Sequence, residues 1–76
     1  MPTIARLQYC VILMFFQDHN PPHFHVRGLD RREVWVRISD LSVIKGDMDR
    51  RALTEALEWA KENQQFLQET WDDFQN

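Results

Sequence analysis

The sequence predicts an α+β domain in which a small antiparallel sheet of three or four strands is followed by one C-terminal helix packed on one sheet face. Two observations support this order, β-β-β-(β)-α. Between residues 9 and 45, short segments are rich in β-branched and aromatic residues or alternate apolar and polar side chains, as strands do. From residue 49 onward, apolar side chains recur with the period of a helix. A chain of 76 residues is expected to form a single domain, residues 1–76, whose small core invites help from a partner or a second copy, as in a homodimer.

The first expected strand, Tyr9–Phe16, is apolar on both faces, which is typical of a central strand. The Asn-Pro-Pro that follows ends it. His23–Arg27 alternates as a second strand, and Gly28–Arg32 supplies a turn into a third strand, Glu33–Ile38. Leu41–Lys45 would add a short edge strand, closed by the next glycine.

The helix is expected to begin near Asp49, with Asp47 or Asp49 accepting a backbone N–H as its N-cap. Asn63 is the one amide within the apolar face, and it needs hydrogen-bond partners if it is buried. The acidic side chains fall on the opposite, solvated half. The apolar half gathers Ala52, Leu53, Ala56, Leu57, Trp59, Ala60, Phe66, Leu67, Trp71 and Phe74.

Residues two apart on a strand point to the same sheet face. Phe24 and Val26 are therefore expected beneath the helix, together with the apolar positions of the third strand. Groups that bind phosphate and stack on bases would share the uncovered face. These are His23, His25, Arg27, Trp35 and Arg37.

Composition and charge exclude several classes of protein. The net charge is −3, and residues 51–76 carry six acidic side chains against two basic ones, so the chain is not a general polyanion binder. The single cysteine, Cys10, excludes an internal disulfide and is expected to be inert in an apolar strand. The longest apolar run is too short to cross a membrane, and no secretion leader follows Met1. A cytoplasmic protein without membrane contact is expected.

All three histidines lie within Asp18–His25, a segment that also holds two adjacent prolines. A purely structural cluster is one interpretation, with Asp18 only starting a turn. Acid–base cleavage of RNA is a second, with His23 and His25 as acid and base in an order left open. Arg27 or Arg37 would then stabilise charge on the phosphate, and Trp35 would stack on a base.

Metal binding is the third interpretation of the histidine segment. A His-x-His pair on a strand presents two nitrogens to one divalent ion such as zinc, nickel, manganese or iron. His19 or Asp18 could complete the ligand shell of His23 and His25. The string Asp-His-x-Pro-Pro-His-x-His is rare, but its rarity does not choose between catalysis and metal binding.

The string Asp18-His19-Asn20-Pro21-Pro22-His23-Phe24-His25, with Met-Pro-Thr-Ile at the start and Ala56-x-x-Trp59-Ala60-x-x-Asn63 in the helix, resembles the bacterial family called domain of unknown function 4160. Members of that family are often encoded beside a second small protein in candidate toxin–antitoxin pairs. The resemblance implies a cognate small protein as partner and a toxin-like role.

A looser likeness is to HicA toxins, which cleave messenger RNA and place a strand histidine on a sheet backed by a C-terminal helix. This chain departs from them by lacking room for their N-terminal helix, by its several histidines and by its acidity. The leading expectation is the toxin side of a two-protein module that acts on RNA through His23 and His25 without metal. The alternatives are a non-catalytic metal-dependent or protein-binding module, and the neutralising partner of such a pair.

Overall fold

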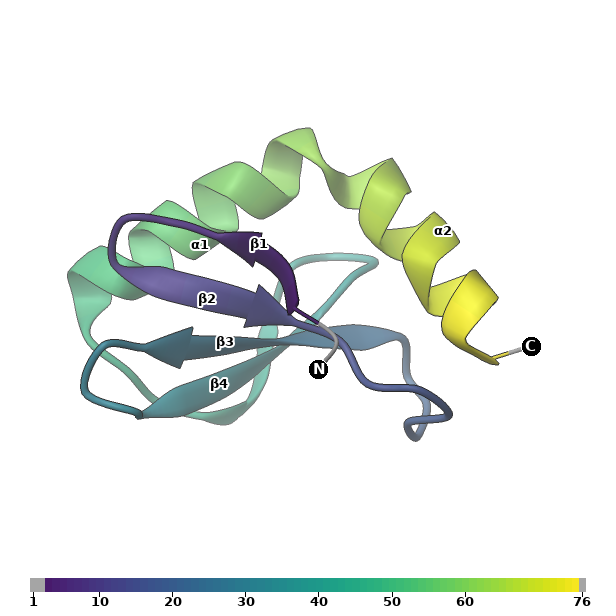
Figure 1. Cartoon of the computed structure of the whole chain (residues 1–76), viewed down its shortest axis with the longest axis horizontal. Coiled ribbons are helices and arrows are strands. Elements are labelled where there is room, and N and C mark those ends of the chain that lie inside the picture. Colours follow the sequence, from purple (N-terminus) through teal and green to yellow (C-terminus); the bar gives the residue numbers. More distant parts are fainter. Residues whose placement is uncertain (1–2, 76) are drawn as a thin grey trace.

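The computed structural model describes residues 3–75, which form a five-stranded antiparallel sheet followed by two helices (Figure 1). The strands pair in chain order, β1-β2-β3-β4-β5. The expected α+β class is confirmed, whereas the sheet has one strand more and the C-terminal region one helix more than expected. The elements are β1 Thr3–Arg6, β2 Cys10–Leu13, β3 His23–Gly28, β4 Glu33–Arg37, β5 Val43–Gly46, α1 Arg50–Glu62 and α2 Gln64–Gln75.

The first expected strand is shorter than predicted, because β2 ends at Leu13 and the chain then leaves the sheet. Residues 14–22 form the loop that connects β2 to β3, and we call it the β2–β3 loop. β2 is central, as expected, because the unpredicted strand β1 pairs with its outer side. Four mixed residues are too few to show a strand period. The expected edge strand exists as β5, which includes the glycine thought to close it.

The prediction of one continuous helix was wrong, because the helix is interrupted at Asn63. Asn63 caps α1: its backbone N–H donates to the carbonyl of Ala60 at 3.0 Å, and its side-chain amide donates to that of Trp59 at 2.7 Å. Asparagine side chains compete in this way with helical hydrogen bonding. At the other end of α1, Asp49 is the N-cap and accepts from the backbone N–H of Ala52 at 3.1 Å.

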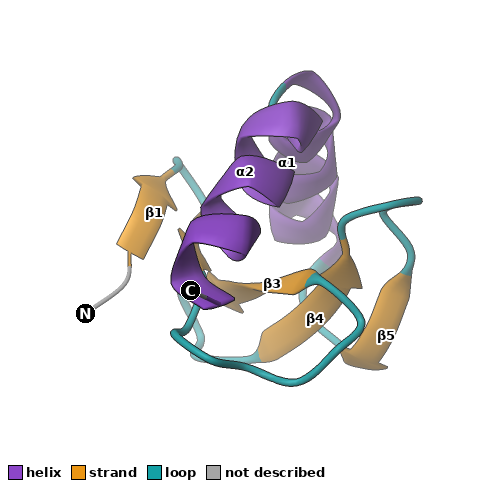
Figure 2. Cartoon of the chain, turned by 90° about the vertical axis from the view of Figure 1, so that its right-hand side faces the viewer, coloured by secondary structure: helices purple, strands orange, loops and turns teal. Residues whose placement is uncertain are grey.

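The core lies between α1 and one face of the sheet. Three fully buried alanines, at positions 52, 56 and 60, let α1 approach the sheet closely. β3 contributes Phe24 and Val26 to the same cluster, β4 contributes Val34 and Val36, and Ile38 follows directly after β4. α1 lies on this side and the β2–β3 loop descends on the other, while α2 starts beside α1 and descends to the level of the sheet (Figure 2).

α2 turns away from α1 and descends past one end of the sheet towards the β2–β3 loop (Figure 1). Its first turn is fixed by Gln64, whose side-chain amide donates to the carbonyl oxygens of Ile38 at 2.6 Å and Ser39 at 3.0 Å. Leu67 and Trp71 are its buried residues. Within residues 3–75, neither helix is long and apolar enough to span a membrane.

Candidate metal centre

The alternation of β3 separates its side chains as predicted. Phe24 and Val26 belong to the core under α1, and His23 and His25, which alternate with them, project to the opposite face. Register places His25 opposite Trp35 and His23 opposite Arg37 on β4. The sheet therefore gathers the predicted residues on one face.

The expectation that this face is open was wrong at the histidines, since His23 is only 2% exposed and His25 only 5%. Trp35 stacks on the ring of His23, with centroids 5.1 Å apart, and Phe15 packs edge-on against His25 at 4.7 Å. Trp71 of α2 approaches His23 at 5.3 Å. The cover comes from the neighbouring strand, the β2–β3 loop and α2.

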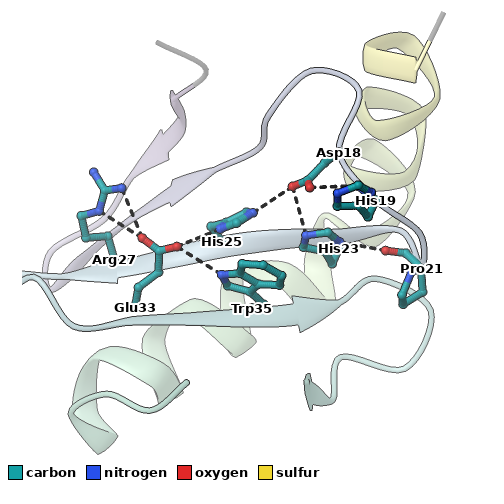
Figure 3. A network of polar contacts seen from close by, with 8 residues as sticks. All are labelled: Asp18, His19, Pro21, His23, His25, Arg27, Glu33 and Trp35. Atoms are coloured by element: carbon teal, nitrogen blue, oxygen red, sulfur yellow. Dashed lines mark hydrogen bonds and ion pairs between the residues drawn. The ribbon is translucent and has the colours of Figure 1, made fainter. Parts of the chain in front are cut away.

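Asp18 reaches from the β2–β3 loop to both histidines (Figure 3). Its Oδ2 lies 3.1 Å from Nε2 of His23 and 3.1 Å from Nε2 of His25. These three atoms lie within 4.8 Å of one another. The structure thus brings together one carboxylate and two imidazoles from a segment of eight residues.

The partner of the second nitrogen fixes the tautomer of each ring. Nδ1 of His23 lies 2.8 Å from the carbonyl oxygen of Pro21, and Nδ1 of His25 lies 2.8 Å from Oε2 of Glu33. Carbonyl and ionised carboxylate oxygens only accept hydrogen bonds, so both Nδ1 atoms carry the proton. In a neutral ring this leaves the lone pair on Nε2, directed at Asp18.

Carboxylate or carbonyl partners on the outer nitrogen are the usual surroundings of metal-binding histidines, because they fix the tautomer and orientation of the ring. Two ligand atoms about 2.1 Å from one ion are roughly 3.0 Å apart in octahedral geometry and about 3.4 Å apart in tetrahedral geometry. The 3.1 Å separations of Asp18 Oδ2 from the two nitrogens fall in this range. Both contacts of Asp18 therefore have the separation expected of two ligands of one metal ion.

Electrostatics keeps both carboxylates of the site ionised. Burial by itself raises the pKa of Asp18, but hydrogen bonds from the His19 backbone and the His25 ring, with the nearby imidazoles, hold that pKa below its ordinary value. Burial likewise acts to raise the pKa of Glu33, and hydrogen bonds from His25 and Arg27 outweigh it, so this pKa is also lowered. Two ionised carboxylates favour a cation at this site.

Glu33 was missed by the sequence analysis. Its carboxylate accepts from His25, from Nε1 of Trp35 at 3.2 Å and from Arg27 at 3.2 Å. The signal was available, because the predicted hairpin places Glu33 directly opposite Arg27 and diagonal to His25. Residues that support a ligand lack a motif of their own, and only strand pairing identifies them.

The other predicted residues surround the centre. His19 is exposed; its backbone N–H donates to Asp18 Oδ1 at 2.8 Å, but its ring lies outside the ligand cluster. Arg27 pairs with Glu33, and Arg37 pairs with Asp40 at 3.2 Å. Each arginine side chain is about two-fifths exposed, at 41% and 40%. Both guanidiniums are thus engaged with carboxylates at the rim.

The fold and the site define a small α+β protein with a buried cluster of one aspartate and two histidines. The family model described as Domain of unknown function (DUF4160) matches residues 10–72, and the chain belongs to this family. The resemblance of the sequence to this family is therefore confirmed. No curated protein and no solved structure matches the chain.

Proposed function

We propose that this protein binds one divalent transition-metal ion through Asp18, His23 and His25, and that it acts as a metal-dependent module. The observation that carries the proposal is Nε2 of His23. Among residues 3–75 it is a buried side-chain atom without a hydrogen-bond partner, although a carboxylate oxygen lies 3.1 Å away. Buried polar atoms are almost always satisfied, so this one calls for a ligand.

Two electron-rich atoms at that distance repel each other unless a cation lies between them. A second proton, on Nε2 of His25, would serve the Asp18–His25 contact, which has hydrogen-bond geometry at 3.1 Å. The contact of His23 with the same oxygen does not form a hydrogen bond despite its equal length. A metal ion satisfies both nitrogens and the oxygen together, which a single proton cannot do.

Two imidazoles and one carboxylate suit zinc, iron(II), manganese or nickel better than calcium or magnesium, which prefer oxygen ligands. Such an ion would tie the β2–β3 loop to β3. An ion present at one hundred times its dissociation constant stabilises a protein by about 2.7 kcal/mol. In a domain of this size, that corresponds to a rise in Tm of roughly 10–20 °C.

The test is metal analysis of the purified protein, followed by thermal unfolding with zinc and with chelator. The proposal expects close to one ion per chain and a Tm that falls on chelation. His25→Ala should lose the ion, while the matched variant His19→Ala should keep it, because the His19 ring lies outside the cluster. A Tm indifferent to zinc and chelator, together with no bound metal, would reduce the cluster to a structural ion pair between His25 and Asp18.

We also propose a second candidate, the RNA-cleaving toxin side of a two-protein module, for which His23 and His25 would supply acid–base catalysis. The partly exposed guanidiniums of Arg27 and Arg37 on the same face favour it, because they could contact phosphate. This candidate expects RNA cleavage by the purified protein to persist in chelator. Both this cleavage and growth arrest of cells should disappear in His23→Ala. Growth arrest without RNA degradation, together with a tight complex with a neighbouring small protein, would favour a binding module instead.

A further inference from the structure

Asp18 differs from the other two proposed ligands in how it is held. His23 and His25 are fixed by the pairing of β3 with its neighbours, whereas Asp18 belongs to the β2–β3 loop. The geometry of the centre consequently depends on what anchors this loop.

The anchor is the C-terminal part of α2. The carbonyl oxygen of Phe74 accepts from the backbone N–H of Gln17 at 3.2 Å, directly before Asp18. The ring of Phe74 stacks on that of Phe16, with centroids 4.2 Å apart and planes 23° apart. One turn earlier, Trp71 contacts the ring of His23. α2 therefore touches both the loop that carries one ligand and the strand that carries the others.

The backbone of Gln17 also needs this support. Its φ is +55°, in the left-handed region that costs a residue with a Cβ about 1–2 kcal/mol. Such a conformation persists where surrounding contacts determine it. The hydrogen bond to Phe74 is such a contact, and the next residue along the chain is Asp18.

We infer that α2 is a positioning element of the metal centre, with Phe74 as a positioning residue, and that metal binding in turn stabilises the docking of α2 on the loop. This inference rests on the proposed metal site. The effect of metal binding on α2 follows from the effect of α2 on metal binding, because coupling between two equilibria is reciprocal. Beyond Gln64 in its first turn, α2 is held mainly by Leu67, Trp71 and Phe74, so its docking is sensitive to the loop.

The first experiment measures zinc affinity in the full-length protein by competition with a chromophoric chelator. Phe74→Ala should bind one zinc ion but about 10–100-fold more weakly, as is usual when support of a ligand is lost. Phe74→Tyr, which keeps a ring for stacking, should restore most of the affinity. The matched control is Phe66→Ala on the same helix, because Phe66 is 47% exposed. Equal affinities of Phe74→Ala and Phe66→Ala would overturn the inference while leaving the metal site intact.

The second experiment is hydrogen exchange of the wild-type chain with zinc and with chelator. Zinc should slow exchange in α2 by a larger factor than in α1, and Phe74→Ala should abolish this difference. Equal protection of both helices would overturn the inference. If Phe74→Ala fails to fold, the wild-type comparison decides alone. Absence of zinc binding by the wild type would instead refute the proposed function.

Discussion

Replacing Glu33 with glutamine tests whether the outer carboxylate holds His25 in its ligand orientation. Oε2 of Glu33 accepts from His25 and Trp35, and Oε1 accepts from Arg27. Glutamine keeps the shape but has one acceptor oxygen, so its NH2 group must face the donors of Arg27 or those of His25 and Trp35. At least one partly buried donor loses its acceptor, which costs about 1–3 kcal/mol of stability.

The same substitution should weaken metal binding about 10–100-fold, because Glu33 fixes the tautomer of a proposed ligand. Stability is measured by urea unfolding in chelator, and affinity by competitive zinc titration. The matched control is Glu58→Gln, which removes an exposed carboxylate from α1. If Glu33→Gln equals the control in both stability and zinc affinity, this role for Glu33 is refuted.

The effect of Glu33→Gln also has a pH dependence of defined sign. Because the folded state lowers the pKa of Glu33, its carboxylate adds stability above its ordinary pKa of 4.5, and this stability is lost as pH falls through the lower pKa of the folded state. The stability difference between wild type and Glu33→Gln in chelator should therefore shrink in that acidic window. A difference that grows towards acid would contradict the sign.

Three other predictions concern residues outside the metal centre. Burial and the nearby Glu55 raise the pKa of the Cys10 thiol to about 12 from 9.0, so alkylation of the folded protein at pH 8.5 should be slow, and urea stability should fall between pH 9 and 12 more steeply in wild type than in Cys10→Ala. Gly46→Ala should lower the free energy of unfolding by more than about 1 kcal/mol, because φ is +85° and a Cβ would overlap the backbone oxygen of Glu33. Asp49→Ala, which removes the N-cap of α1, should cost about 1 kcal/mol in the same urea assay.

Sequence patterns predicted those features of the structure that depend on residues close together in the chain. Alternation along β3 set which side chains face α1, because neighbouring strand residues must point to opposite faces. The N-cap at Asp49 was predictable for the same reason, since it involves only the next turn of chain. The rare histidine segment contains the three side chains that the structure brings together, Asp18 among them, and their role as ligands stays a prediction.

The burial of His23 and His25 could not be predicted from the strand period of the sequence alone. Residues 14–16 are apolar and continue the composition of β2, so they were assigned to the strand. Instead the chain leaves the sheet there, and Phe15 folds onto His25. A hydrophobic residue can be buried in a strand or in a loop that crosses a sheet, and composition does not distinguish the two. The break at Asn63 is similar, because it depends on the side chain bonding back to α1.

Burial is the property that separates the two candidate functions. An acid–base pair acting on RNA must bring two substrate oxygens within about 3 Å of its nitrogens. Here Trp35 stacks on the ring of His23, and the Nε2 atoms of both histidines face Asp18 rather than solvent. The proposed ion would lie between those atoms with the β2–β3 loop in place, whereas a polynucleotide requires Asp18 and its loop to move aside. Zinc bound there should therefore oppose catalysis by these imidazoles. Under the second candidate, added zinc lowers RNA cleavage and chelator leaves it unchanged, whereas under the first candidate chelator lowers thermal stability.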